Sequence, residues 1–277
     1  MAYGIDPSPR GVASRASDAL DATIVLVGCG GTGSFLAEAT CRLLIGRAAS
    51  LYLVDMDRVE EHNVGRQAFD PGEIGGFKAQ VLAERLARRF RCTIGYAVQP
   101  YDAGLHARIF RAQPSRLNLL VGCVDNADAR RALTASSEGR SDVWWLDCGN
   151  GRNSGQVLLG NASHPDGLRG AFDEREGVCR ALPSPALQRP DLLDAPPAPP
   201  PALDCAEAIA REIQGPTINQ VVAAIAASFV EKLLAGSCRM MSAYFDLDDV
   251  TLRCILAEPK TVAGIVGLHP KAVTRRS

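Results

Sequence analysis

The sequence predicts an α/β fold: a Rossmann-like, doubly wound, mostly parallel sheet with a C-terminal antiparallel extension. Three observations predict it. Apolar, β-branched runs alternate with segments of helical apolar spacing, which is typical of strands connected by helices. The apolar runs are near-continuous, as in parallel strands covered on both faces. Two further strand-like runs lie together near the C-terminus, and we expect them to form an antiparallel pair.

The predicted elements follow one another along the chain. The expected strands are 23–28, 51–55, 117–125, 142–150, a short strand in GQVLLG (155–160), and the closing pair AYFDL (243–247) and TLRCILA (251–257). Helical spacing occurs in FLAEATCRLLIG (35–46), KAQVLAERLARRF (78–90) and GPTINQVVAAIAASFVEKLLAG (215–236). The last of these helices is apolar almost all round, with Thr217 as its candidate N-cap.

Composition excludes several classes of protein. The net charge of -1 argues against a broad nucleic-acid surface, so we regard nucleic acid as an unlikely partner. No apolar run reaches the roughly 20 residues of a membrane span, and MAYGIDPSPR lacks a signal-peptide core, so we expect a cytoplasmic protein away from membranes. Nine cysteines without a C-x-x-C pair predict no structural zinc and mostly reduced, structural thiols.

A glycine-rich segment, GCGGTGS (28–34), connects the first strand to its helix. Glycines let backbone amides approach a phosphate, and the helix N-terminus adds positive potential. The glycines concerned are Gly28, Gly30, Gly31 and Gly33. The alternative is a tight turn that binds nothing. The segment therefore indicates a nucleotide without showing which one.

Two acids end strands that border the same crevice. Asp55 ends the second strand, where a carboxylate can hydrogen-bond ribose hydroxyls. Asp125 ends the LNLLVGCVD strand and is a candidate Mg²⁺ ligand, because Mg²⁺ in phosphate sites uses one or two carboxylates plus phosphate oxygens. Its alternative role is to cap the helix that begins in NADARRAL.

Two basic residues, Lys78 and Arg66, indicate that the nucleotide is a triphosphate. Lys78 begins its helix, where a cation opposes the macrodipole, so a triphosphate would explain its position. Arg66 is a fork-shaped donor suited to phosphate oxygens. Each could instead be a solvated surface charge. With Asp55, Asp57 and Asp125 around a glycine loop, they favour ATP with Mg²⁺ over hydride transfer, and they would neutralise charge as pyrophosphate leaves.

Four motifs together resemble the ThiF/HesA/MoeB family, the adenylating domain shared with ubiquitin-activating enzymes. They are GCGGTGS, VDMDRVEEHNVGRQ, the following Lys78, and VGCVDNADAR. The similarity covers about residues 23–160 and resumes at DCAEA and the 216–235 helix. WLDCGN, GQVLLG and the unpaired Cys205 resemble most the ThiF-type proteins of bacterial PRTRC gene clusters.

The resemblance implies that the C-terminal carboxylate of a small ubiquitin-like or sulfur-carrier protein attacks the α-phosphate of ATP, giving an acyl-adenylate and pyrophosphate. By position, the nucleotide and Mg²⁺ site would contain Gly31, Asp55 at the ribose with Asp57 nearby, Asn63, Arg66, Gln67 and Lys78 at the phosphates, and Asp125 with Asn126 at the metal. Cys205 occupies the place of an acceptor cysteine, with Cys179 as its rival.

The resemblance also organises the chain as one adenylating domain over residues 1–277. We expect an N-terminal arm (1–22), a nucleotide-binding core (23–160), an irregular region (161–215) and a final part with a helix and closing strands (216–277). The proline-dense 182–204 predicts an extended, mobile loop. We also expect a homodimer, because the family resemblance and the apolar 217–235 helix both suggest one. That helix could instead pack entirely within its own subunit.

Departures and alternatives remain. The two C-x-x-C zinc pairs of many members are missing, and Arg10 and Arg15, the only N-terminal arginines, do not have the spacing expected of an arginine that reaches the partner's ATP. The same fold could adenylate a small molecule or a tRNA adduct, or serve as a nucleotide-binding scaffold without turnover. An NAD-dependent dehydrogenase would leave Arg66, Gln67 and Lys78 unexplained.

Overall fold

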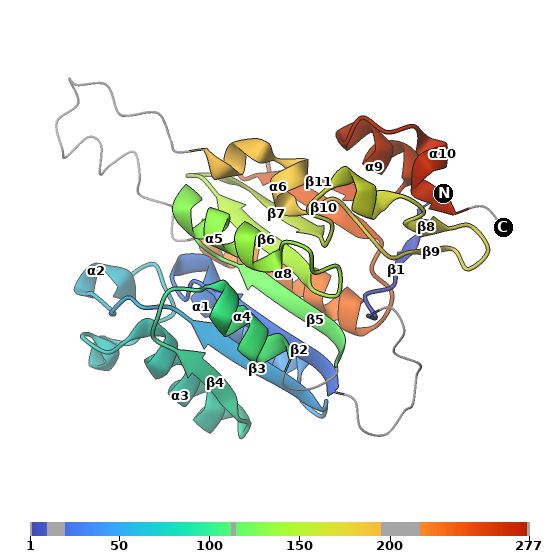
Figure 1. Cartoon of the computed structure of the whole chain (residues 1–277). Helices are drawn as coiled ribbons and strands as arrows, with labels where there is room; N and C mark the ends of the chain where they lie inside the picture. Colours follow the sequence, from blue (N-terminus) through green and yellow to red (C-terminus); the bar gives the residue numbers. More distant parts are fainter. Residues whose placement is uncertain (1, 10–19, 112–114, 195–216, 276–277) are drawn as a thin grey trace.

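An eight-stranded sheet forms the centre of the computed structural model, which describes residues 2–9, 20–111, 115–194 and 217–275 (Figure 1). Its strand order is β11-β10-β7-β6-β5-β2-β3-β4. The strands from β6 to β4 are parallel, and β7, β10 and β11 extend the sheet in antiparallel fashion, which confirms the predicted fold class. The strands are β2 Leu20–Val27, β3 Ala49–Val54, β4 Ile94–Ala97, β5 Ser115–Gly122, β6 Trp144–Asn150, β7 Ser154–Gly160, β10 Met240–Asp246 and β11 Thr251–Leu256.

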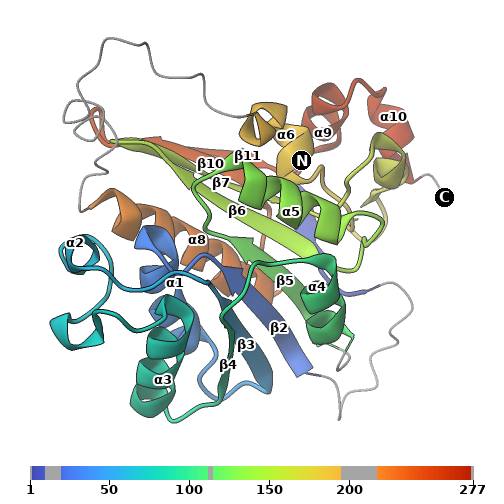
Figure 2. The ribbon, with the colours of Figure 1, turned by 60° about the vertical axis from the view of Figure 1, so that its left-hand side comes forward.

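Helices cover both faces of this sheet, as Figure 2 shows. On one face α1, α3 and α8 share an apolar core that includes Leu36 and Phe229. On the other face α4 and α5 pack around Leu105 and Trp145. The helices are α1 Gly31–Leu43, α2 Glu61–Val64, η1 Pro71–Glu73, α3 Lys78–Phe90, α4 Ala103–Phe110, α5 Ala127–Ser137, η2 Pro165–Leu168, α6 Pro185–Gln188, η3 Pro190–Leu193, α8 Ile218–Leu234, α9 Pro259–Ile265 and α10 Pro270–Val273.

A small second sheet brings the two ends of the chain together (Figure 1). β1 (Gly4–Ile5) pairs in parallel with β9 (Val178–Cys179), and β12 (Thr274–Arg275) pairs in parallel with β8 (Phe172–Asp173). β8 and β9 are antiparallel to each other. The region predicted to be irregular therefore contains two strands. A two-residue strand has no periodicity, so the sequence could not indicate either one.

Most long elements lie where the sequence predicted them. α3 spans the predicted 78–90, and β3, β5, β6, β7, β10 and β11 overlap their predicted strands. β4 and α4 lie in 91–116, for which no element was predicted. β4 has only four residues, one of them Gly95, so its apolar pattern is too short to recognise. Within the described residues, no helix combines the length and apolar character needed to cross a bilayer.

The prediction of an extended loop over 182–204 is wrong for its described part, 182–194. This part contains α6 and η3, each with a proline in its first turn, where proline favours a helix. It is also fixed to the end of β7, because the Leu182 carbonyl accepts from the N–H groups of Asn161 and Ala162, at 3.0 Å each. The Gln188 side chain adds a bond of 2.9 Å to the Leu159 carbonyl. Residues 195–204 lie outside the described residues.

The apolar helix α8 packs largely within its own subunit. Thr217 is at its N-cap position but makes no side-chain capping bond. Ile218, Val222 and Phe229 are buried, while Gln220 is among the exposed residues of the opposite face. Burial within the chain thus explains the apolar character of this helix. The homodimer stays a prediction that now depends on the family resemblance.

Gly160 tests how tightly the 182–188 segment is held against β7. A Cβ atom at Gly160 would lie 1.9 Å from the Pro183 carbonyl oxygen, a backbone atom that cannot rotate away. We expect Gly160→Ala to lower the free energy of unfolding by about 1–3 kcal/mol, as other overpacked core substitutions do. Denaturant unfolding measures this change.

Gly264→Ala is the matched control, because a Cβ at Gly264 in α9 meets no atom within 4 Å. Alanine has the higher helix propensity, so this variant should be neutral or slightly more stable. Equal unfolding free energies for the two variants would contradict the tight contact at Gly160.

Candidate nucleotide-binding site

The turn from β2 into α1 has no room for a side chain at Gly28 or Gly33. Gly28 has φ of +90°, and a Cβ there would lie 2.5 Å from the Cys123 carbonyl oxygen. A Cβ on Gly33 would lie 1.8 Å from the Gly28 carbonyl oxygen. α1 begins at Gly31 after Gly30, and no side chain caps it. Its first N–H groups therefore remain available to an anion.

Asp55 braces this turn. Its Oδ2 accepts a hydrogen bond from the Cys29 N–H at 2.6 Å, and its Oδ1 accepts from the Asp57 N–H at 2.8 Å. Burial raises the pKa of the Asp55 carboxyl, although these two N–H groups oppose the rise. Asp55 thus lies next to the glycine loop, as predicted, and it already has a structural role there. Its contact with ribose stays a prediction.

The second acid of the segment pairs with the lysine. Lys78 Nζ lies 3.2 Å from Asp57 Oδ2, and the Lys78 N–H donates to the Asp57 carbonyl at 2.8 Å. The lysine side chain is only 10% exposed, whereas that of Asp57 is 62% exposed. A largely buried ammonium therefore depends on one solvated carboxylate, and Asp57 fixes the position of the first residue of α3.

Asn63 shapes the turn that presents Arg66 and Gln67. Its Oδ1 accepts from the Glu60 N–H at 3.0 Å, and its carbonyl accepts from the N–H groups of Arg66 and Gln67 at 3.0 and 2.9 Å. Asn63 is buried, so its carboxamide acts on the backbone of this segment. The structure indicates a supporting role for Asn63, and its predicted contact with phosphate stays untested.

Arg66 and Gln67 carry unused bonding capacity. Within the described part of the chain, the Arg66 guanidinium makes no hydrogen bond or ion pair. Gln67 is buried, and its Oε1 atom has no hydrogen-bond partner there. Its Nε2 lies 3.8 Å from the position of a Cβ on Gly30. Buried polar atoms are nearly always paired in folded proteins, so the Gln67 oxygen indicates a missing donor, such as a solvent molecule, beside the glycine loop. Arg66 is only partly buried, so its guanidinium is open to solvent or to an anion.

Asp125 and Asn126 follow β5, next to the glycine loop. Asn126 Oδ1 accepts from the Ala129 N–H at 2.8 Å and so caps α5. The alternative in which Asp125 caps this helix is therefore wrong. The Asp125 carboxylate is exposed, with Asn126 Nδ2 at 3.2 Å from its Oδ1. In the described ranges, no three His, Cys, Asp or Glu side chains come together as a metal site.

A buried ion pair, which the motifs did not indicate, holds the Asp125 turn. Arg130 Nε lies 3.3 Å from Asp147 Oδ1, and another Arg130 nitrogen donates to the Val124 carbonyl at 2.9 Å. Asp147 is fully buried and its Oδ2 has no partner. Burial raises the pKa of Asp147 to about 6, and Arg130 opposes this rise. A charged residue inside an apolar strand such as WWLDCGN is the sequence signal that could have identified Asp147.

Asn219, in the first turn of α8, was also missed. It is 1% exposed, and its carboxamide lies between the glycine loop, the Arg66 segment and the end of β6. An asparagine in the first turn of an otherwise apolar helix was a visible but weak signal.

Two cysteines, Cys205 and Cys179, are the candidate acceptors. Cys205 lies outside the described residues, as do Arg10 and Arg15. Its rival Cys179 is buried in β9, and burial raises the pKa of its thiol to about 12. A thiol of that pKa is almost entirely protonated at neutral pH and is a poor nucleophile. The structure therefore disfavours Cys179 as an acceptor.

The profile of the ThiF family matches residues 13–260 of this chain. The chain belongs to the ThiF family. The family relation indicated by the four motifs is thereby confirmed.

Curated relatives of this ThiF-family chain include ubiquitin-like modifier-activating enzyme 5 from two animals. The Branchiostoma floridae protein is 29% identical over 187 residues, which are 58% of this chain and 44% of that protein. The Xenopus laevis protein is 31% identical over 183 residues, which are 57% of this chain and 45% of that protein. The match thus spans less than half the length of these relatives.

Solved structures with a similar fold include PaaA and E. coli MccB with ATP. PaaA has a TM-score of 0.57 and 13% identity, covering 85% of this chain and 64% of PaaA. MccB with ATP has a TM-score of 0.53 and 15% identity, covering 86% of this chain and 64% of MccB. At these identities the likeness shows the fold alone.

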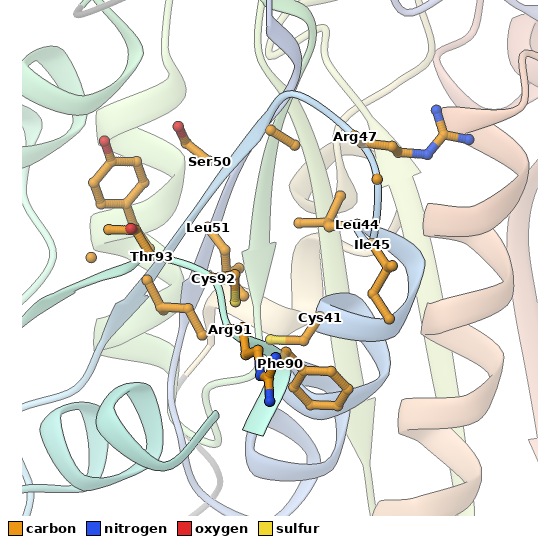
Figure 3. Close-up of a pocket in the computed structure, with 15 residues that line it drawn as sticks. Cys41, Leu44, Ile45, Arg47, Ser50, Leu51, Phe90, Arg91, Cys92 and Thr93 are labelled. Carbon is orange, nitrogen blue, oxygen red and sulfur yellow. The ribbon is translucent and has the colours of Figure 1, made fainter. Parts of the chain in front are cut away.

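A cavity of about 520 Å³ lies away from the candidate site (Figure 3). It is bounded by the C-terminal end of α1, the residues after α3 and the beginnings of β3 and β4. Cys41 and Cys92 line it, and burial raises the pKa of Cys41 to about 12. None of the predicted site residues lines this cavity.

Asp147 predicts a specific pH dependence of stability. Below about pH 3 its carboxyl is protonated in both folded and unfolded chains. Between its ordinary pKa of 3.8 and about 6, the unfolded chain ionises this carboxyl while the folded chain keeps it protonated, which favours unfolding. The free energy of unfolding of the wild type, relative to Asp147→Asn, should therefore fall by about 3 kcal/mol between pH 3 and pH 7.

Denaturant unfolding of both proteins at several pH values measures this difference. Asp128→Asn, at an exposed carboxylate in the first turn of α5, controls for the loss of a surface charge. A wild-type minus Asp147→Asn difference that is constant over this range would show that the Asp147 pKa is not raised.

Proposed function

We propose that this ThiF-family protein uses ATP and Mg²⁺ to adenylate the C-terminal carboxylate of a small ubiquitin-like or sulfur-carrier protein. The observation that carries the proposal is the uncapped start of α1, whose first N–H groups are available to an anion, together with the Arg66 guanidinium, which has no partner among the described residues. The family and the relatives named as ubiquitin-like modifier-activating enzymes support the same reaction.

The start of α1 would bind the triphosphate through its backbone N–H groups. Arg66 would donate to phosphate oxygens without giving up an existing partner. Lys78 would share Asp57 or exchange it for phosphate oxygens, so that its largely buried ammonium keeps an anionic partner throughout. A triphosphate offers the largely buried ammonium several anionic oxygens in return.

The reaction would begin with attack of the carrier's carboxylate oxygen on the α-phosphorus. A carboxyl–phosphorus bond forms, the bond to the β-phosphate oxygen breaks, and pyrophosphate leaves with the electron pair. Arg66 and Lys78 would stabilise the charge that develops on the phosphate oxygens. Asp125 would hold Mg²⁺, since one carboxylate is sufficient where phosphates supply other ligands. When bound, the ion would offset the charge of pyrophosphate.

The remaining parts of the proposal depend on the family. The carrier protein is the expected partner, the enzyme is expected to be a homodimer, and we place the reaction in the cytoplasm. Adenylation of a small molecule or tRNA adduct is the main alternative, and a scaffold without turnover is the second.

ATP–pyrophosphate exchange tests the proposal directly. We expect exchange that requires Mg²⁺ and a carrier with a free C-terminus. Arg66→Ala and Asp125→Ala should each lower the rate roughly a hundredfold or more, the scale of losing one strong electrostatic contact in the transition state.

Arg88→Ala and Asp128→Ala, which remove exposed charges of the same kind, are the matched controls and should leave exchange unchanged. Unaltered exchange in Asp125→Ala would refute the assignment of Mg²⁺ to Asp125. Exchange with a small molecule in place of the carrier would favour the main alternative, and calorimetric binding of NAD but not ATP would overturn the proposal.

Transfer to a cysteine gives a separate prediction. We propose that Cys205 attacks the acyl-adenylate, so that a thioester to the carrier forms and AMP leaves. Enzyme, ATP, Mg²⁺ and carrier should then give a conjugate on gels that thiol reductant removes. The conjugate should disappear in Cys205→Ala while pyrophosphate exchange survives.

Cys179→Ala is the control, because Cys179 is buried. A conjugate lost in Cys179→Ala but kept in Cys205→Ala would reverse the assignment. Intact exchange without any conjugate would indicate an enzyme that stops at the adenylate.

A further inference from the structure

The side chain of Asn219 occupies the space that a side chain on Gly31 would need. An ideal Cβ on Gly31 would lie 2.4 Å from Asn219 Nδ2, 2.5 Å from its Cγ and 2.6 Å from its Oδ1. Such distances are far below van der Waals contact. The two residues belong to α1 and α8, which lie side by side in both ribbon views (Figures 1 and 2). A side chain at Gly31 would therefore force Asn219 or the glycine loop to move.

The same carboxamide connects three segments of the candidate site. Its Oδ1 accepts from Thr32 Oγ1 at 3.3 Å and from Asn150 Nδ2 at 2.8 Å. Its Nδ2 makes a longer contact of 3.5 Å with the Arg66 carbonyl oxygen. Thr32 belongs to the first turn of α1, Asn150 ends β6, and Arg66 follows α2. One buried side chain thus relates the start of α1 to the backbone that carries the unpaired guanidinium.

From these contacts we propose that Asn219 is a positioning residue for the nucleotide site. It holds the first turn of α1, which would bind phosphate through its N–H groups, at a fixed distance from the Arg66 segment. Asn219 need not touch ATP to do so. This inference rests on the proposed function, because it assigns to Asn219 the alignment of two groups that would bind the same triphosphate.

The energetic reason for an asparagine is specific. A buried carboxamide is stable only when its polar atoms are paired, and each bond it makes contributes about 1 kcal/mol. A leucine of similar size would fill the space but would leave the Thr32 hydroxyl and the Asn150 amide with one partner fewer. An alanine would release Gly31 from close contact and would loosen the first turn of α1. Both substitutions should therefore lower the affinity for ATP, because the glycine loop is misaligned, while the chain stays folded.

A size swap between positions 31 and 219 tests the proposal. Gly31→Ala should weaken ATP binding about a hundredfold, because the new methyl group displaces Asn219 or the loop. Asn219→Ala should weaken it about tenfold. The double variant should bind ATP as well as Asn219→Ala does, since the methyl group then occupies vacated space. Calorimetry measures the ATP dissociation constant, and thermal unfolding of each variant reports its stability.

Gly33 provides the matched control. A Cβ on Gly33 would meet the Gly28 carbonyl oxygen at 1.8 Å, which is a backbone atom that no substitution removes. Asn219→Ala should therefore fail to rescue Gly33→Ala. Rescue restricted to position 31 would establish that Asn219 acts through Gly31.

A positioning role is separated from a purely structural one by enzyme kinetics at a temperature where every variant is folded. Asn219→Ala and Asn219→Leu should raise the KM for ATP in pyrophosphate exchange more than they lower kcat. Unchanged ATP affinity in Asn219→Ala, or a double variant no better than Gly31→Ala, would overturn the proposal. A wild type that fails to bind ATP would instead refute the proposed function, so the two failures are distinguishable.

Discussion

The close approach of β2 and α1 determines the geometry of the whole site. The Gly28–Gly33 contact leaves no space for a methyl group, so the chain reverses within a few residues and the helix begins directly above the sheet. Asp55 then ties the end of β3 to the same turn through the Cys29 N–H. The neighbouring end of β5 is fixed by the Cys123 N–H, which donates to the Val27 carbonyl at 2.8 Å. The carboxyl ends of the parallel strands β2, β3 and β5 therefore lie close together.

One buried polar atom of this region is kept at a cost in stability. Arg66 is only partly buried, so its guanidinium can be solvated without a partner in the described chain. Gln67 leaves a buried oxygen unpaired, and unpaired buried polar atoms cost roughly 1–3 kcal/mol each. Other buried polar atoms of the described chain, such as Asn118 Oδ1 and Ser242 Oγ, are also unpaired, so this feature alone does not define a site. A polyanion would supply oxygens to the Arg66 and Lys78 side chains, whereas the Gln67 oxygen needs a hydrogen-bond donor.

Short-range patterns explain what the sequence could predict. The glycine loop, Asp55, Lys78 and Asp125 each stand at a strand end or helix start, and such positions follow from periodicity alone. Asn219 could not be found in this way, because it is 153 residues from Arg66 and 187 from Thr32 in the sequence. The same limit applies to the small sheet and to α6, whose stability comes from contacts with β7 and not from a local pattern.

Four aspartates near the edge of the sheet show how environment divides one chemical group among several roles. Asp55 accepts two backbone N–H bonds and serves the turn, while Asp57 faces solvent and holds the buried Lys78. Asp147 is enclosed and paired with Arg130, so it supports the segment that leads to Asp125. Asp125 is exposed, and because Asn126 performs the capping of α5, its carboxylate has no structural task that would compete with a metal ion. Of the two exposed acids, Asp57 pairs with Lys78, whereas Asp125 forms no ion pair within the described residues.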